Sequence, residues 1–294
     1  MNQKNKKKVC LFFNHERGLN VFKYLNKNKN YEVSKVFLSK KNLKKKIIPI
    51  IKKSKYSYSL VRKVNSKKVI NFIIKNKIDF NIICGFPYIF NNKLLNSSKY
   101  GTLNLHGGKL PNYKGASTLN WQIINGEKKI GISIIQANTS IDGGDILAQS
   151  NFKLRENHDI KKVHQIVNKK FPILLSKVLK KLLNKKLNPK KNKNGKIYKQ
   201  RKPSDGKIFW HKMTNIQVFN FIRALTLPYP GAFSFEKLSK KKIIFFKSRK
   251  SNLNPSIKPG TVFFKKKNIF VKCKKGSLQI LKSSNKLINK SLLN

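Results

Sequence analysis

The sequence predicts an α/β fold: a mostly parallel, Rossmann-like sheet flanked by helices, followed by a small C-terminal β-barrel domain. In the first half of the chain, short apolar runs alternate with helical patterns, which is typical of βαβ units around a parallel sheet. After Gly231, short apolar runs alternate with turns at the spacing of a small barrel. We therefore expect one domain in residues 1–185, a linker in 186–205, and a bridging helix with the barrel in 206–294.

Strand candidates and helical patterns alternate along the first half. The strand candidates are residues 9–13, 31–38, 80–84, 102–106 and 131–136. A helical pattern covers residues 17–25, a Lys-rich amphipathic stretch covers 42–54, and apolar residues three or four apart predict a helix over 66–77. One face of the last helix is expected to carry Val69, Ile70, Ile73 and Ile74. A longer helical pattern covers 158–183, in which Pro172 is a point where the helix can break.

The second half begins with a Lys- and Asn-rich stretch, 184–201, that contains Pro189 and Gly195 and is typical of a linker. A capping box at Thr214 and Gln217 then predicts a helix that reaches about Leu225. The expected barrel strands are residues 232–235, 243–246, 260–264, 269–271 and 278–281.

The net charge of +57 is extreme and would suit a nucleic-acid or membrane-surface binder. However, only six of the 67 basic residues are arginine, the residue that reads phosphates and bases through two parallel hydrogen bonds. The lysines are spread along the whole chain together with many Asn, Ile and Phe residues. This distribution favours an AT-rich coding bias, and selected affinity for a polyanion remains the alternative.

Two further features indicate a cytoplasmic protein. No apolar run approaches the length of about 20 residues that a membrane helix needs, and the run at 9–13 is too short for the core of a signal peptide. The three cysteines, Cys10, Cys84 and Cys273, lie far apart and form neither a disulfide framework nor a metal-binding motif. We therefore expect reduced thiols and no metal site.

The segment around His106 has the highest density of chemically active residues. Side chains alternate along a strand, so Asn104 and His106 share one face near the carboxyl end of strand 102–106. Ligands bind at that end in open parallel sheets. Gly107 and Gly108 let the backbone turn and let a ligand approach, because neither carries a Cβ atom. A lone histidine in this place would more simply be structural.

Asp142 follows the next strand and brings a carboxylate to the same end of the sheet. The simpler interpretation of Asp142-Gly143 is a tight turn, where this dipeptide is common. An amide, an imidazole and a carboxylate that converge are suited to acyl transfer: the amide stabilises an oxyanion, and the His–Asp pair moves protons.

Several motifs together resemble the formyltransferase family that uses 10-formyltetrahydrofolate. The motifs of the first domain are Asn104-x-His106-Gly107, Leu110-Pro111-x-Tyr113-x-Gly115, Asn125-Gly126-Glu127, Gly131-Ile132-Ser133 and Asp142-x-Gly144-Asp145. The motifs further along are Arg201-Lys202-Pro203-x-Asp205, Phe209-Trp210-His211-Lys212, Ile222-Arg223-Ala224 and Pro228-Tyr229-Pro230-Gly231-Ala232-Phe233. The second set is similar to the bridge into the C-terminal barrel of two-domain members, and the resemblance runs from about residue 9 to about 281.

The resemblance implies a catalytic first domain and roles for individual residues. Asn104, His106 and Asp142 map onto the catalytic trio of the family. The loop after strand 80–84 would receive the pterin ring of 10-formyltetrahydrofolate, which implies cofactor-binding roles for Gly85, Phe86, Tyr88 and Ile89, and Ile141, next to Asp142, is expected to join them. The expected substrate-binding residues are Lys109, Tyr113 and Lys114, and the two lysines would meet the diphosphate of the acceptor. The alternatives are core packing for Phe86 and Tyr88, and plain solvent exposure for each lysine.

Two acceptors stay open within this family. The motifs Leu119-Asn120-Trp121 and Phe209-Trp210-His211-Lys212 favour the two-domain enzymes that formylate the primary amine of a sugar nucleotide. Methionyl-tRNA formyltransferases share the plan, and the +57 charge would suit tRNA. Single-domain glycinamide ribonucleotide formyltransferases are shorter and carry a Gly-rich phosphate loop, of which this chain has only Gly18. A non-catalytic nucleic-acid binder is the remaining class, and the intact trio speaks against it.

Overall fold

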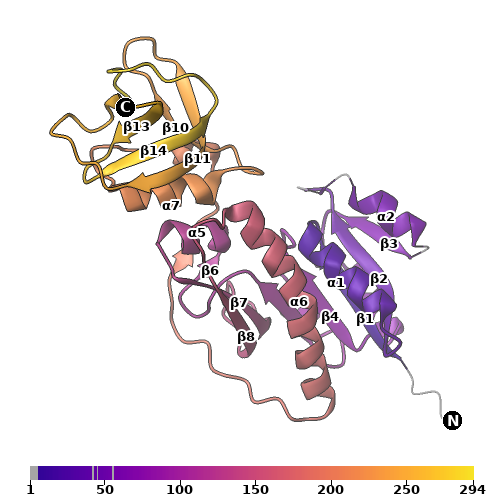
Figure 1. Cartoon of the computed structure of the whole chain (residues 1–294). Coiled ribbons are helices and arrows are strands. Elements are labelled where there is room, and N and C mark those ends of the chain that lie inside the picture. Colours follow the sequence, from indigo (N-terminus) through magenta and orange to yellow (C-terminus); the bar gives the residue numbers. More distant parts are fainter. Residues whose placement is uncertain (1–5, 42, 45, 55) are drawn as a thin grey trace. The chain divides into compact units, whose positions relative to one another are not determined.

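The computed structural model describes residues 6–41, 43–44, 46–54 and 56–294 (Figure 1). The chain forms two compact units that are interleaved in the sequence. The first unit comprises Met1–Gly115, Gly131–Asn151 and Gln165–Ile197, and the second comprises Ala116–Ile130, Phe152–His164 and Tyr198–Asn294. The expected boundaries at 185 and 205 remain a prediction about which parts fold independently.

A seven-stranded sheet organises the first unit, in the order β3-β2-β1-β4-β5-β7-β8. Its strands are β1 (Lys7–Phe13), β2 (Tyr31–Ser39), β3 (Tyr58–Val61), β4 (Phe80–Cys84), β5 (Thr102–His106), β7 (Lys129–Gln136) and β8 (Ile146–Lys153). The pairs from β3 to β5 are parallel, and β5 pairs with β7 in antiparallel fashion. The mostly parallel sheet is therefore confirmed, while β3 and β8 were not expected from the sequence.

The helices of this part cover the sheet with one apolar face each. They are α1 (Glu16–Lys27), α2 (Ile47–Lys53), α3 (Lys67–Lys75), α4 (Asn92–Leu95) and α6 (Ile160–Leu183), whereas α5 (Thr118–Ile124) belongs to the second unit. In α3, Val69 and Ile73 are buried, but Ile74 is 58% exposed. The prediction for Ile74 is wrong, because a residue next to Ile73 lies about 100° further round a helix. Helix α6 runs unbroken through Pro172.

One hydrophobic cluster packs side chains of β1, β2 and β3 against those of α3 and α4, and we call it the β1 cluster. Phe12 and Phe37 stack with ring centroids 4.7 Å apart, and Phe90 meets Phe12 edge-on at 4.9 Å. Phe86 and Tyr88, which follow β4, pack against this cluster and are partly buried. The loop that leaves β4 is therefore anchored by its own aromatic side chains.

The second unit contains α7 (Asn215–Leu225) and a five-stranded antiparallel sheet, β10-β11-β14-β13-β12. The strands are β10 (Ala232–Phe235), β11 (Lys242–Ser251), β12 (Val262–Lys265), β13 (Asn268–Lys272) and β14 (Ser277–Ser283). The capping box is confirmed: Thr214 Oγ1 accepts from Gln217 N, and Gln217 Oε1 accepts from Thr214 N. Leu293 bridges to Glu236 beyond β10, and Leu292 bridges to Thr261 before β12. The C-terminal residues thus join the two edges of the sheet.

The stretch expected as a linker is hydrogen-bonded to the first unit. Lys190 and Ile146 exchange both backbone hydrogen bonds, at 2.8 and 2.9 Å. The short strand β9 (Ile197–Tyr198) pairs with β6 (Lys114–Gly115), just after the His106 loop. Among the helices of the described residues, none has the length and apolar character needed to span a membrane.

Candidate active site

The end of β5 places the first two members of the trio. β5 lies between β4 and β7, and its register sets Asn104 opposite Ile135 and His106 opposite Ser133. Strand alternation puts both side chains on one face. The His106 side chain is buried, and that of Asn104 is half-buried.

Asp142, in the turn between β7 and β8, joins the other two residues. Its Oδ1 accepts a hydrogen bond from Asn104 Nδ2 at 2.9 Å and lies 3.3 Å from His106 Nδ1. Its Oδ2 accepts from the backbone N–H of Gly115 at 2.8 Å. The structure therefore brings the three residues together around one carboxylate.

The His106 ring is held between two hydrogen-bond acceptors. Nδ1 faces Asp142 Oδ1, and Nε2 lies 2.5 Å from the carbonyl oxygen of Tyr113. Burial lowers the pKa of His106, the Asp142 carboxylate and the Tyr113 carbonyl raise it, and the Arg17 guanidinium lowers it; the net direction is below the ordinary 6.5. A neutral imidazole has one N–H and satisfies one of the two acceptors, whereas the charged form satisfies both. The ring is thus a buried base, and a second proton on it would give each ring nitrogen an N–H that faces an acceptor.

Two glycines leave room for this arrangement. A Cβ atom on Gly108 would overlap the Tyr113 carbonyl oxygen and His106 Nε2. A Cβ atom on Gly144 would overlap the carbonyl oxygen of Gln136, at the end of β7. The close approach of backbone at these points requires glycine.

The predicted cofactor residues divide into packed and exposed ones. Phe86 and Tyr88 are partly buried against the β1 cluster, with ring centroids 5.5 Å apart. Ile89 is 66% exposed and Ile141 is 49% exposed. Gly85 has a φ of 66°, and the atom nearest to a Cβ there would be His15 Cδ2, at 3.5 Å. The backbone at Gly85 and the side chains of Ile89 and Ile141 are therefore accessible from outside the β1 cluster.

The predicted substrate residues are also placed differently from one another. Lys109 is exposed. Tyr113 and Lys114 are buried: the Tyr113 carbonyl contacts His106, and Lys114 Nζ donates to the Lys193 carbonyl at 3.1 Å. Of these three side chains, the Lys109 ammonium is the one the structure leaves at the surface.

Sequence reasoning missed several residues that shape the site. Ser133 Oγ donates to the Gly108 carbonyl at 2.7 Å and accepts from Leu110 N at 3.3 Å, and Gln149 Nε2 donates to Ser133 Oγ and to the Leu110 carbonyl. This network fixes the loop that follows His106. Arg17 Nη1 donates to the Leu105 carbonyl at 3.4 Å, between Asn104 and His106. Ser133 belongs to a family motif, whereas Gln149 gave no local signal.

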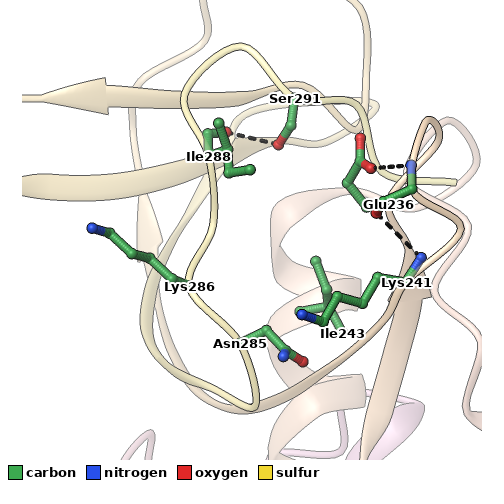
Figure 2. Close-up of a pocket in the computed structure, with 8 residues that line it drawn as sticks. Glu236, Lys241, Ile243, Asn285, Lys286, Ile288 and Ser291 are labelled. Carbon is green, nitrogen blue, oxygen red and sulfur yellow. Dashed lines mark hydrogen bonds between the residues drawn. The ribbon is translucent and has the colours of Figure 1, made fainter.

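A separate pocket in the second unit, shown in Figure 2, contains none of the residues around His106. Its lining residues are Glu236, Ser239, Lys241, Ile243, Asn285, Lys286, Ile288 and Ser291. The Glu236 carboxylate accepts hydrogen bonds from Ser239 N at 2.6 Å and Leu238 N at 3.3 Å, and its hydrogen bonds to Ser239 hold its pKa below the ordinary range. This carboxylate closes the turn between β10 and β11. The described residues contain no group of three or more His, Cys, Asp or Glu side chains that could hold a metal ion.

Comparison with known families and proteins gives a consistent result. Residues 7–179 match the formyl transferase family, and residues 200–289 match the formyl transferase C-terminal domain. The bifunctional polymyxin resistance protein ArnA of Wigglesworthia glossinidia brevipalpis is 35% identical over 277 residues. That match covers 90% of this chain but 39% of the relative, so the chain spans less than half of the relative's length.

Solved structures share the fold. An N-formyltransferase from Helicobacter canadensis, in complex with folinic acid and dTDP-3-aminofucose, has a TM-score of 0.70 at 17% identity, with 95% of this chain and 99% of that one covered. Methionyl-tRNA formyltransferase from Clostridium thermocellum has a TM-score of 0.56 at 20% identity, with 84% and 94% covered. At these identities the likeness concerns the fold alone.

Proposed function

The chain belongs to the formyl transferase family, and from this premise we propose that it transfers a formyl group from 10-formyltetrahydrofolate to the primary amine of an amino-sugar nucleotide. The observation that carries the proposal is that Asn104 and His106 both meet the Asp142 carboxylate at the carboxyl end of β5. Residues Gly85, Ile89 and Ile141 would receive the pterin, and Lys109 would meet the acceptor's diphosphate.

The folate supplies an activated formyl carbon, and the residues of the trio act on the atoms around it. Asn104 Nδ2 donates one hydrogen bond to Asp142, and its second amide hydrogen can be donated to the formyl oxygen as negative charge develops there. His106 is neutral before attack, because burial lowers its pKa, and the proton that the amine loses can pass through the Asp142 carboxylate, 3.3 Å from Nδ1, to the imidazole. Asp142 and the Tyr113 carbonyl then stabilise the imidazolium, and the proton passes to the folate nitrogen that leaves.

Two observations support the sugar-nucleotide acceptor. The ArnA relative is 35% identical to this chain over 90% of this chain's length. The Helicobacter enzyme of the same fold was solved with folinic acid and dTDP-3-aminofucose. Methionyl-tRNA is the second candidate, and the net charge of +57 is the observation that favours it.

A direct assay separates the two acceptors. The purified chain is incubated with 10-formyltetrahydrofolate and a panel of UDP-, GDP- and dTDP-linked amino sugars, beside aminoacylated initiator tRNA, and formylated product is measured. We expect turnover on an amino-sugar nucleotide with a shallow dependence on salt. Turnover on methionyl-tRNA alone, falling steeply as salt releases phosphate contacts, would instead identify the second candidate as the function.

A further inference from the structure

A segment far from the trio in sequence crosses the loops that build the site. We call residues 190–196 the strap. Its first residue pairs with Ile146, where β8 begins, and the carbonyl groups of Lys193 and Lys196 accept from Nζ and the backbone N–H of Lys114. The strap thus contacts both the end of the Asp142 turn and the loop that presents Tyr113 and Gly115.

Within the strap, Asn192 is hydrogen-bonded to the Asp142 turn itself. Its Nδ2 donates to the Asp142 carbonyl at 2.7 Å and to the Gly144 carbonyl at 3.0 Å. Two carbonyl acceptors fix the orientation of the amide, since only its NH2 end can donate. Its Oδ1 is buried and has no hydrogen-bond partner among the residues that the structure describes. A buried acceptor without a partner is unfavourable, so the hydrogen bonds from the NH2 group to the Asp142 and Gly144 carbonyls must offset this cost.

The backbone that Asn192 holds is in an unusual conformation. Asp142 has a φ of 46°, in the left-handed region that favours glycine. Gly144 lies directly against the Gln136 carbonyl, so this end of the turn is also constrained. In this conformation, the Asp142 carbonyl points to the strap while the carboxylate meets Asn104, His106 and Gly115.

We propose that Asn192 is a positioning residue for formyl transfer, which holds the Asp142–Gly144 turn in the conformation that aims the Asp142 carboxylate at Asn104 and His106. The inference rests on the proposed function for its kinetic readout. It assigns a role in the reaction to a stretch expected to be a linker.

The inference predicts the direction of a pKa change. The charged groups that act on His106 are Asp142, from the turn, and Arg17, from α1; the uncharged Tyr113 carbonyl is the remaining partner. If Asp142 turns away, its carboxylate no longer raises the pKa of His106, whereas burial and Arg17 still lower it. The pKa of His106 should therefore fall further when the Asn192 amide is removed.

The test compares Asn192→Ala and Asn192→Asp with Lys191→Ala in the full chain. Asn192→Asp keeps the shape but cannot donate as a carboxylate. Lys191 also joins the strap to this loop, through a 3.0 Å ion pair with Asp145, but its side chain is 85% exposed, so it is the matched control. We expect both Asn192 variants to lose about 10- to 100-fold in kcat, as a displaced catalytic group does, with little change in KM for the folate. Lys191→Ala should stay within about twofold of the parent.

Two readouts separate positioning from simple bracing of the fold. In an Asp142→Asn background, Asn192→Ala should cause almost no further loss, because the residue acts through Asp142. The pKa of His106, followed by NMR with no acceptor present and assigned with His106→Gln, should fall in both Asn192 variants. A lower thermal midpoint with unchanged kcat, an unchanged His106 pKa, or losses that multiply with Asp142→Asn would overturn the inference. A parent enzyme that formylates no amino-sugar nucleotide would refute the proposed function, while the NMR titration would still decide on Asn192.

Discussion

Replacement of Asp142 by asparagine tests the proposed role of this carboxylate in formyl transfer. The carboxylate receives hydrogen bonds from Asn104 Nδ2 and Gly115 N and faces His106 Nδ1, so all three groups around it are donors when His106 is charged. An amide in the same place turns one oxygen into a donor, and either orientation sets that NH2 against at least one of these groups. It also removes the negative charge that stabilises the imidazolium. We expect a loss of about 3–5 kcal/mol of transition-state stabilisation, or roughly 10²- to 10⁴-fold in kcat.

The assay is steady-state formylation with each substrate varied in turn, over a range of pH. KM for 10-formyltetrahydrofolate should change little, because the carboxylate matters most as charge develops. Asp145→Asn is the control, since Asp145 lies three residues away and its ion pair with Lys191 is exposed. A kcat for Asp142→Asn within about threefold of the parent, or an equal loss in Asp145→Asn, would refute the reasoning.

Two further predictions concern the room and the protons of the site. Gly108→Ala should abolish most formylation in a chain that still folds, because the added methyl group would displace His106 Nε2 or the Tyr113 carbonyl. Circular dichroism checks the fold, and a kcat equal to that of the parent would show that the loop accommodates the methyl group without moving His106. The free energy of unfolding should decrease as the pH falls below about 6.5, because burial lowers the pKa of both His15 and His106 and the unfolded chain then binds more protons than the native one. Urea midpoints at pH 7.5 and 5.5 measure this decrease, and His15→Gln should make it smaller; a midpoint that rises on acidification would contradict the assignment.

The sequence predicts the sheet and the shared face of Asn104 and His106 well, because both depend on local patterns. Apolar runs mark β1, β4 and β5 within two residues of their observed bounds, and strand alternation places Asn104 and His106 on one face. The capping box at Thr214 likewise depends on residues three positions apart.

What the sequence does not predict depends on tertiary contacts. Pro172 remains inside α6, where the packed helix continues through it. The hydrogen bonds of Gln149 to the His106 loop and of Asn192 to the Asp142 turn join residues 39 and 50 positions apart, respectively, and no local pattern signals such contacts. The β8 strand has alternating burial, but in its sequence, Ile-Leu-Ala-Gln-Ser-Asn-Phe-Lys, no apolar run continues beyond the first three residues.

The interleaving of the two units constrains how this protein can diversify. The chain passes from one unit to the other after Gly115, Ile130, Asn151, His164 and Ile197, so no single cut separates them. Recombination that exchanged one continuous stretch of gene would transplant fragments of both units, and a piece that ended at residue 185 would leave Asn192 behind. New acceptor preferences in such a chain would therefore arise more readily through point substitutions and loop insertions than through the shuffling of whole modules.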